Sequence, residues 1–175
     1  HVTEVQRDFL TTVKQQTDQL QNLINDLLEF SRLESGQVKL RLTEVSLTEV
    51  AAEVADKLKP LADQGQVQLI NRIGPDVPNI EADLTRIEQV LTNLVDNAIK
   101  FTNIGGKIFI STYQLNNEVV IKIRDTGVGI PEDELGRIFE RFYRVDKSRR
   151  GDQGRGVGLG LVIANEIAKS HGGSI

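Results

Sequence analysis

The sequence predicts an α+β fold, in which helices and a sheet form layers, with one long helix in front of them. Three observations predict this class. The first 34 residues contain neither glycine nor proline and carry apolar residues at helical spacing. After them, segments with the alternation typical of strands lie between further helical segments. Two of these strands, 107–113 and 118–124, flank a short polar turn, and such a hairpin fits an α+β arrangement better than a parallel, doubly wound sheet.

The N-terminal segment, residues 3–34, is predicted to form an amphipathic helix that ends at Ser35. Val13, Leu20 and Leu27 recur every seven residues, which is the spacing typical of coiled coils. Two interpretations fit this pattern: the helix packs on its own domain, or it pairs with a partner helix in a bundle or dimer. A helix that has nothing yet to pack on, in what we expect to be a fragment, favours the second interpretation.

The segment after the long helix is predicted to form a strand and then a helix. Apolar residues alternate with polar residues over 38–42, as in a half-buried strand. Ser46 and Glu49 form a capping-box pattern, which predicts a helix over 47–64 that Pro60 should end or kink. The remaining elements are expected to be a strand over 67–73, a helix over 84–101 with Asp83 as its N-cap, a short helix from Pro131 to about Phe142, and a last helix over 159–170.

Composition excludes several kinds of site. The chain has no cysteine and two histidines, His1 and His171, so it offers no disulfide, no cysteine nucleophile and no histidine-rich metal site. No run of 18 apolar residues occurs, so no segment is predicted to span a membrane. The net charge of −4 argues against a nucleic-acid-binding surface. Residues 137–155 differ, because they carry seven basic and three acidic side chains, which marks a candidate site for an anionic ligand.

The helix predicted over 84–101 has an unusual polar face. Asn93, Asn97 and Lys100 follow one another at i, i+4 and i+7, so they point in similar directions. Amide oxygens can ligate a hard cation, and a lysine one turn away can contact phosphate. A solvated face would explain any one of these residues, but the three together suit a magnesium-bound polyphosphate.

Two glycine-rich motifs lie further along the chain. In the first, Asp125 is followed by Gly127 and Gly129, which allow the backbone to approach a flat ligand closely. A tight structural turn accounts for this motif equally well, and a dinucleotide fingerprint would need glycine where Glu132 stands. In the second, residues 154–161, glycines before a helix expose N–H groups that can bind phosphate. A flexible loop is the alternative, and neither a Walker P-loop nor the protein-kinase signature set is present.

The order and spacing of four motifs are more specific than any one of them. They are Asn-x-x-x-Asn-x-x-Lys at 93–100, Asp-x-Gly-x-Gly at 125–129, Phe-x-x-Phe-Tyr-Arg at 139–144 and Gly-x-Gly-x-Gly-Leu at 154–159. They closely resemble the N box, first glycine box, F box and second glycine box of sensor histidine kinases, which belong to the GHKL ATPase superfamily. The resemblance covers residues 44–175 and implies a two-layer α/β sandwich, the Bergerat ATP-binding fold.

Residues 25–36 resemble the end of the second helix of the dimerisation and phosphotransfer domain of that family. The resemblance therefore implies that residues 1–36 are part of this domain and that residues 37–175 are an ATP-binding catalytic domain. The chain begins without methionine and stops where the family continues into further strands. We expect it to be a piece of a longer protein, truncated at its C-terminal strands.

The resemblance also implies roles for individual residues. Asp125 would accept a hydrogen bond from the adenine amine. Gly127, Gly129 and Ile130 would shape the adenine pocket. The other implied ligands of ATP and magnesium are Asn93 and Asn97 at the metal and phosphates, Lys100 at a phosphate, Phe101 beside the nucleotide, Tyr143 and Arg144 on the lid side, and Gly156, Gly158, Leu159 and Gly160 at the phosphates. Asn93 and Lys100 are the expected catalytic residues.

Some positions depart from the family pattern. Arg155 stands where glycine is common and Val157 where threonine or serine is common, which affects the geometry of the lid. The family's acceptor histidine is followed by an acidic residue and then Leu-Arg-Thr-Pro, whereas His1 is followed by Val-Thr-Glu-Val. His171, at a helix end, matches a structural histidine of the family. We therefore expect no phosphoacceptor histidine in this chain.

The resemblance implies a protein-histidine kinase that transfers the γ-phosphoryl group of ATP to a histidine, and thence to an aspartate of a response regulator. The partners expected are ATP with Mg²⁺, a response-regulator receiver domain and a second copy of the chain, in the cytoplasm. One alternative is a GHKL-type ATPase, although such enzymes place glutamate where Asn93 stands, and an amide cannot act as a general base. Another is a non-catalytic nucleotide-binding or dimerisation module.

Overall fold

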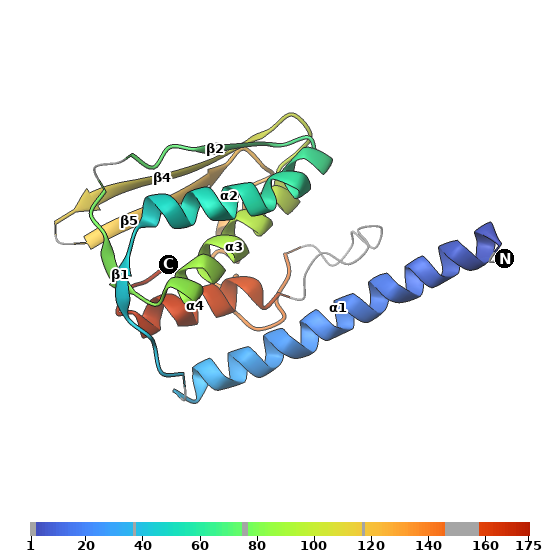
Figure 1. Cartoon of the computed structure of the whole chain (residues 1–175), viewed down its shortest axis with the longest axis horizontal. Helices are drawn as coiled ribbons and strands as arrows, with labels where there is room; N and C mark the ends of the chain where they lie inside the picture. Colours follow the sequence, from blue (N-terminus) through green and yellow to red (C-terminus); the bar gives the residue numbers. More distant parts are fainter. Residues whose placement is uncertain (1–2, 37, 75–76, 117, 146–157) are drawn as a thin grey trace.

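The computed structural model describes residues 3–36, 38–74, 77–116, 118–145 and 158–175. A long helix extends away from a body in which helices lie over a sheet (Figure 1). Within the described residues the elements follow in this order: α1 (Glu4–Glu34), β1 (Thr43–Val45), α2 (Leu47–Gln64), β2 (Gln68–Asn71), β3 (Ile80–Ala82), α3 (Leu84–Phe101), β4 (Lys107–Leu115), β5 (Glu118–Asp125), the 3-10 helix η1 (Glu132–Glu134) and α4 (Gly160–Ser170).

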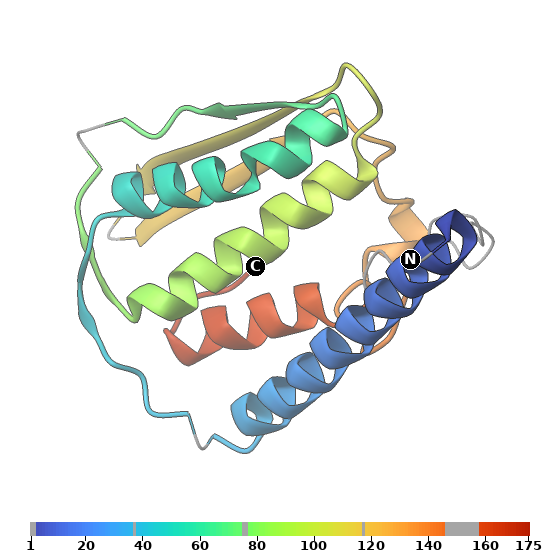
Figure 2. The same ribbon diagram turned by 45° about the vertical axis from the view of Figure 1, so that its right-hand side comes forward.

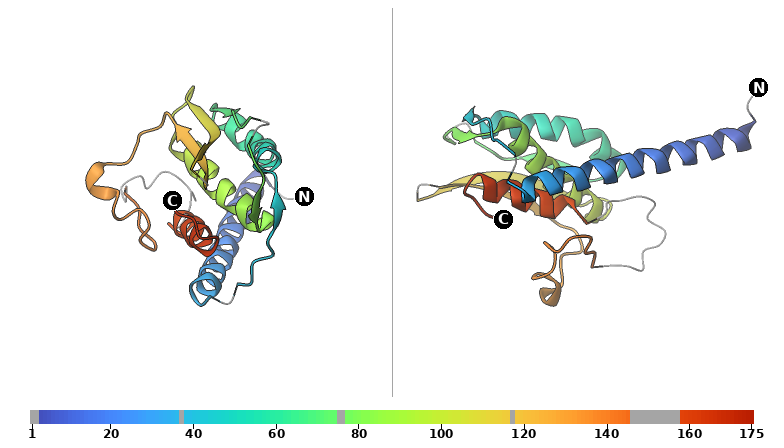
Figure 3. Two further views of the ribbon diagram at one scale, coloured as in Figure 1. Left: turned by 90° about the vertical axis from the view of Figure 1, so that its left-hand side faces the viewer. Right: turned by 90° about the horizontal axis from the view of Figure 1, so that it is seen from below.

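Helix α1 begins with the side-chain cap that its sequence encodes. The Thr3 hydroxyl accepts a hydrogen bond from the backbone N–H of Gln6, and the Gln6 side chain accepts one from the N–H of Thr3. Only the C-terminal part of the helix packs on the body, where Phe30 and Leu33 are each 6% exposed. The rest projects beyond the body (Figure 3), and its apolar side chains are exposed.

The main sheet has the strand order β2-β4-β5. β4 pairs antiparallel with β5, with Ile108 opposite Asp125 and Leu115 opposite Glu118, which confirms the predicted hairpin. β2 pairs parallel with β4. The short strands β1 and β3 form a separate antiparallel pair.

The helices form a layer on one face of this sheet. α2 and α3 cover the sheet, α4 lies beside α3, and the C-terminal part of α1 lies along α4 (Figure 2). The main core lies between α2, α3 and the sheet, and a smaller apolar cluster joins Phe30 and Leu33 of α1 to α4. This arrangement confirms the predicted class, a two-layer α/β sandwich preceded by a long helix.

Two predicted elements differ from the structure, whereas the helix predicted over 47–64 is confirmed as α2. The strand expected over 38–42 is wrong, because the strand is Thr43–Val45, which has its ladder partner in β3; the sequence did not indicate β3. Pro60 does not end α2, which continues to Gln64. Pro60 is exposed, so the carbonyl that loses its helical N–H partner there can be hydrated.

The helix expected from Pro131 to Phe142 is also wrong. Only Glu132–Glu134 form a 3-10 helix, and turns follow up to Phe142. The backbone bonds in this segment join residues three apart, as from Arg137 N to Glu134 O at 2.9 Å and from Glu140 N to Arg137 O at 2.8 Å. Tight turns of this kind replace the α-helical pattern.

Candidate functional site

Helix α3 carries the asparagine and lysine motif and is fixed at its first turn. The Asp83 carboxylate accepts a hydrogen bond from the backbone N–H of Arg86 at 3.2 Å, so Asp83 is the predicted N-cap. The apolar side of the helix packs in the main core. Asn93, Asn97 and Lys100 are half-buried, so their polar groups lie partly sheltered from water beside the body of the protein.

The middle of α3 lies against the start of α4. Asn93 Nδ2 donates a hydrogen bond to the carbonyl oxygen of Gly160 at 3.2 Å. Gly160 is the first residue of α4 and belongs to the second glycine motif, residues 154–161. The bond uses the amide nitrogen as donor and leaves Asn93 Oδ1 as the oxygen that could meet a cation. The structure thus brings together two motifs that lie 67 residues apart in the sequence.

The C-terminal end of α3 lies against the first glycine motif. The backbone N–H of Val128 donates to the Phe101 carbonyl at 3.2 Å. A Cβ at Gly127 would lie 2.2 Å from the same carbonyl oxygen, so only glycine fits there. The Phe101 side chain is 52% exposed and is free to border a ligand. α3 therefore connects the two glycine motifs, one at its middle and the other at its end.

Asp125 ends strand β5 and shapes the turn that follows. Its Oδ1 accepts a hydrogen bond from the N–H of Gly127 at 2.8 Å, and its side chain is otherwise exposed. Gly129 has φ +70°, a left-handed conformation that favours glycine. Ile130 is 45% exposed. The turn thus presents one carboxylate and one apolar side chain at the edge of the sheet.

The F motif meets the end of the second glycine motif. The N–H of Phe142 donates to the Gly158 carbonyl at 3.3 Å. Gly158 has φ +80°, and a Cβ there would lie 2.7 Å from the Tyr143 carbonyl oxygen. Leu159, which follows, is 1% exposed. Gly156, Arg155 and Val157 lie outside the described residues.

Tyr143 and Arg144 differ in their surroundings. The Tyr143 hydroxyl donates a hydrogen bond to the Glu134 carboxylate, and the Arg137 guanidinium lies 4.1 Å from the centre of the Tyr143 ring. Glu134 is the last residue of η1, and Arg137 lies between η1 and the F motif. Arg144 is exposed. A ligand on this side would therefore meet the exposed Arg144 more readily than Tyr143, whose hydroxyl and ring are both in contact with other side chains.

Lys100 is engaged with a carboxylate. Its ammonium forms an ion pair with Asp96, one turn earlier on α3, and the two side chains are 20% and 27% exposed. A phosphate bound by Lys100 would compete with Asp96 for this charge. The sequence pattern predicted Lys100 as a phosphate ligand but did not indicate this partner.

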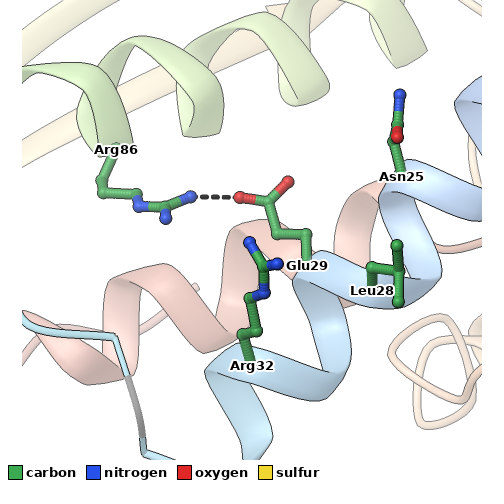
Figure 4. Close-up of a pocket in the computed structure, with 5 residues that line it drawn as sticks. All are labelled: Asn25, Leu28, Glu29, Arg32 and Arg86. Atoms are coloured by element: carbon green, nitrogen blue, oxygen red, sulfur yellow. Dashed lines mark hydrogen bonds and ion pairs between the residues drawn. The ribbon is translucent and has the colours of Figure 1, made fainter.

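Sequence reasoning missed the contacts between α3 and α1. The Arg86 guanidinium forms an ion pair with Glu29 of α1, and Gln89 Nε2 donates to Glu29 Oε2 at 2.6 Å. Figure 4 shows Arg86 pointing across to Glu29, with Arg32 and Leu28 around them. Nothing in the spacing of the sequence pairs a residue of α1 with one 57 positions later.

His171 was predicted as a structural residue, and its contacts join two helices. Its Nε2 accepts a hydrogen bond from the N–H of Asp83 at 3.1 Å, and its Nδ1 lies 2.9 Å from the Ile167 carbonyl. This pattern requires the neutral ring with its proton on Nδ1. The end of α4 is therefore fixed to the start of α3.

Asp83 is hydrogen-bonded to three segments: the one that contains Arg41, the end of α4 at His171 and the first turn of α3 at Arg86. Its Oδ2 accepts a hydrogen bond from the N–H of Arg41 at 2.9 Å, in addition to the cap bond from Arg86. Burial raises the pKa of the Asp83 carboxyl, but the hydrogen bonds from the N–H groups of Arg41 and Arg86 and the charge of Arg86 outweigh burial and lower the pKa overall. The carboxylate form is thus the one that the fold stabilises.

The described residues contain no group of three or more histidine, cysteine, aspartate or glutamate side chains that could hold a metal ion. A metal at α3 would therefore need oxygens from its own ligand besides the amide oxygens of Asn93 and Asn97. Mg²⁺ bound through substrate phosphates has this character. The donor set of α3 fits a cation that arrives with a polyphosphate.

Two family models match the chain. The model of the histidine kinase-, DNA gyrase B- and HSP90-like ATPases matches residues 82–175, more than half of the chain. The model of the His Kinase A (phospho-acceptor) domain matches residues 1–36. The chain therefore belongs to the histidine kinase-, DNA gyrase B- and HSP90-like ATPase family.

The curated relatives that the chain matches are named as histidine kinases. The chain is 34% identical over 99% of its length to the circadian input-output histidine kinase CikA of Synechococcus elongatus, of which it covers 23%. It is 38% identical, again over 99% of its length, to the signal transduction histidine-protein kinase BarA of Escherichia coli, of which it covers 19%. The chain thus spans about a fifth of the length of these relatives.

Solved structures of histidine kinases have the same fold. Full-length ShkA in complex with AMPPNP matches 98% of this chain and 35% of its own chain, with a TM-score of 0.84 and 31% identity. Histidine kinase ThkA in complex with the response regulator TrrA matches 99% of this chain and 47% of its own, with a TM-score of 0.75 and 26% identity. In the described part of the present chain, no helix combines the length and apolar character needed to cross a membrane.

Proposed function

We propose that this chain binds ATP and supplies the catalytic domain that transfers the γ-phosphoryl group of ATP to a histidine. The transfer breaks the bond between the γ-phosphorus and its bridging oxygen, releases ADP and forms a bond from the unprotonated imidazole nitrogen of the histidine to phosphorus. The proton on the other ring nitrogen then passes to solvent. The phosphoryl group then passes to an aspartate of a response regulator. The acceptor histidine lies on a segment other than the 175 residues of this chain.

One observation carries this proposal: α3 is joined to both glycine motifs. Asn93 contacts Gly160 at its middle, and Phe101 contacts Gly127 and Val128 at its end. A nucleotide can therefore lie along one helix, with its base at one glycine turn and its phosphates at the other. Phosphoryl transfer depends mainly on such positioning and on charge stabilisation.

In this arrangement the first glycine motif receives the adenine. The carboxylate of Asp125 accepts a hydrogen bond from the adenine amine, and the exposed Ile130 packs on the ring with Gly127 and Gly129 beneath it. Phe101 borders the nucleotide at the end of α3. An exposed carboxylate at the end of a strand suits this role because it retains an oxygen besides the one that binds Gly127.

The middle of α3 and the second glycine motif receive the phosphates. Lys100 would exchange Asp96 for a phosphate oxygen, and the Asn93 and Asn97 amide oxygens would help to hold a Mg²⁺ ion that arrives with the nucleotide. Bound Mg²⁺ neutralises part of the phosphate charge. The residues that would bind the nucleotide from the lid side are Tyr143, Arg144, Gly156, Gly158, Leu159 and Gly160. Asn93 cannot accept a proton at neutral pH, so transfer to histidine is favoured over hydrolysis by an activated water.

We further propose a domain division at residue 36, with a dimerisation and phosphotransfer segment at 1–36 and the ATP-binding domain at 37–175. The His Kinase A match over residues 1–36 supports this division. The exposed apolar residues of α1, such as Val5 and Phe9, suit a second copy of the helix. The ThkA complex with TrrA supports a response-regulator receiver domain as the other protein partner.

Nucleotide binding tests the proposal most simply. Asp125→Asn keeps one oxygen, which can still accept a hydrogen bond from the Gly127 N–H. It replaces the other carboxylate oxygen, proposed to accept from the adenine amine, with an NH₂ group that donates. Titration calorimetry with Mg·AMPPNP should show about 10- to 100-fold weaker binding, as expected for a lost hydrogen bond to a charged group worth about 1.5–3 kcal/mol. Asp56→Asn, an exposed position on α2, should bind like the wild type. Equal binding by Asp125→Asn and the wild type would overturn the adenine assignment.

A further inference from the structure

The contact between α1 and α3 is polar and centres on Glu29. One carboxylate oxygen of Glu29 pairs with the Arg86 guanidinium, and the other accepts from Gln89 Nε2 at 2.6 Å. Arg86 also donates to Gln89 Oε1 at 3.0 Å, so the three side chains form a closed network. The Arg86 and Glu29 side chains are 24% and 23% exposed, which limits the screening of their charges by water.

This network is fixed to the body on the α3 side. The N–H of Arg86 is bound by Asp83, and the N–H of Asp83 is bound by His171 at the end of α4. Asp83 also binds the N–H of Arg41, in the segment that leads from α1 into the body. The start of α3 is thus a rigid point where α4, the segment after α1 and α1 itself are joined.

The α1 side of the contact borders a pocket that is open to solvent. Its volume is about 310 Å³, and it is lined by Asn25, Leu28, Glu29 and Arg32 of α1 and by Arg86 of α3 (Figure 4). Water can therefore reach this edge of the contact. The contact of α1 with α4 is different, because Phe30 and Leu33 are buried there in an apolar cluster.

Glu29 holds α1 on the face of α3 that carries the asparagines. Gln89 precedes Asn93 by four residues, which is about 6 Å along a helix. The neighbouring Asp26 of α1 supports this placement: burial raises the pKa of its carboxyl, the charge of Glu29 raises it further, and the charge of Lys100 opposes both. Two carboxyl groups of α1 thus lie near the face proposed to receive phosphates.

We propose that Glu29, Arg86 and Gln89 form a polar latch that holds α1 against α3, and that its opening favours occupation of the phosphate-binding face. Negative charge on α1 and the negative charge of a polyphosphate repel each other across this face. Because coupling is reciprocal, a bound nucleotide loosens α1 as much as an opened latch strengthens nucleotide binding. The coupling rests on the proposed function, whereas the latch does not.

Two measurements on the 175-residue chain test the latch: amide hydrogen exchange of residues 26–33 and titration with Mg·AMPPNP. Glu29→Gln should speed exchange in this segment and lower the dissociation constant two- to fivefold. Arg86→Met should speed exchange in the same way. The exchanged pair E29R/R86E, which keeps the net charge, should restore both the exchange and the affinity. Asp18→Asn, an exposed position on the projecting part of α1, is the matched control and should change neither.

Each outcome decides one part of the proposal. Unchanged exchange in Glu29→Gln, or failure of E29R/R86E to restore it, would overturn the latch. Faster exchange with unchanged or weaker AMPPNP affinity in Glu29→Gln would overturn its coupling to the phosphate-binding face. Absence of nucleotide binding by the wild type would overturn the proposed function and with it the coupling, and the exchange data would still decide the latch.

Discussion

Asn93 of α3 donates a hydrogen bond from its side-chain amide to the carbonyl oxygen of Gly160, 3.2 Å away at the start of α4. This bond brings the asparagine motif to the end of the second glycine motif and orients the amide, so that its oxygen is the free acceptor. Orientation of this kind is what a site for phosphates and a hard cation requires, because the liganding atom must be held before the ligand arrives.

Removal of this amide should affect both the fold and the site. Asn93→Ala loses one hydrogen bond, so we expect about 1 kcal/mol of destabilisation in urea unfolding. It also loses a proposed metal ligand, and we expect phosphoryl transfer to an added acceptor to fall by about 100-fold or more. Asn22→Ala on the exposed part of α1 provides the control. Transfer at the wild-type rate by Asn93→Ala would show that this side chain is not part of the machinery.

A methyl group at Gly127 should disturb the junction of α3 with the first glycine motif. The added Cβ would lie 2.2 Å from the Phe101 carbonyl oxygen, so backbone must move. We expect about 1–3 kcal/mol of destabilisation in thermal or urea unfolding, together with weaker nucleotide binding. At Gly136 a Cβ would meet nothing within 4 Å, so Gly136→Ala should be close to neutral. Similar stabilities of the two variants would contradict this close approach.

The stability of the chain should depend on the ionisation of Asp83. Because the folded state lowers its pKa, the carboxylate stabilises the fold above the ordinary pKa of aspartate, about 3.9, and this contribution is lost as pH falls through the lowered value. Asp83→Asn keeps the cap bond to Arg86 but replaces the oxygen that accepts from the Arg41 N–H with a donor, so it should cost about 1 kcal/mol at pH 7. The difference from the wild type should shrink below about pH 4. Urea unfolding across this pH range measures it.

Asp63→Asn is the matched control for Asp83, since Asp63 is exposed near the end of α2. Its effect should be near zero at every pH. A constant difference between Asp83→Asn and the wild type from pH 7 to pH 3 would show that charge at Asp83 contributes nothing, and that any effect comes from the changed shape of the side chain.

Phe30 and Phe9 of α1 should have different roles, Phe30 in the contact of α1 with the body and Phe9 in self-association. Phe30 is 6% exposed and lies against α4, with the Arg141 guanidinium 4.5 Å from its ring, so Phe30→Ala should destabilise the contact of α1 with the body by about 3 kcal/mol. Phe9 is 69% exposed on the same helix, so Phe9→Ala should leave that contact intact and weaken self-association. Hydrogen exchange and sedimentation equilibrium separate the two effects, and loss of the α1 contact in Phe9→Ala would contradict them.

Much of the fold follows from local sequence. The bounds of α1, α2 and α3 were predictable because Thr3, Ser46 and Asp83 are strong N-caps and the apolar residues keep helical spacing. The hairpin was predictable because its turn is short. The strand β3 was not, since three residues carry no pattern of their own and become a strand only by pairing with Thr43–Val45.

The candidate site divides in the same way. Asn93, Asp125 and Gly127 were selected as candidates from residue type and spacing, and their roles in binding stay predictions. The partners that orient or engage the site were not predictable: Asp96 pairs with Lys100, and Glu29 with Arg86. Such pairs depend on which helix faces meet in three dimensions, and the sequence of one helix does not contain that information.

The most direct test of the account is phosphoryl transfer from ATP labelled at its γ-phosphate. The chain is incubated with Mg²⁺, with or without an added phosphotransfer domain that carries the acceptor helix. We predict acid-labile, base-stable label on the added domain and none on the chain itself, whose two histidines are His1 and His171. Label on the isolated chain would contradict the location of the acceptor, and release of free phosphate without any protein label would contradict transfer to histidine.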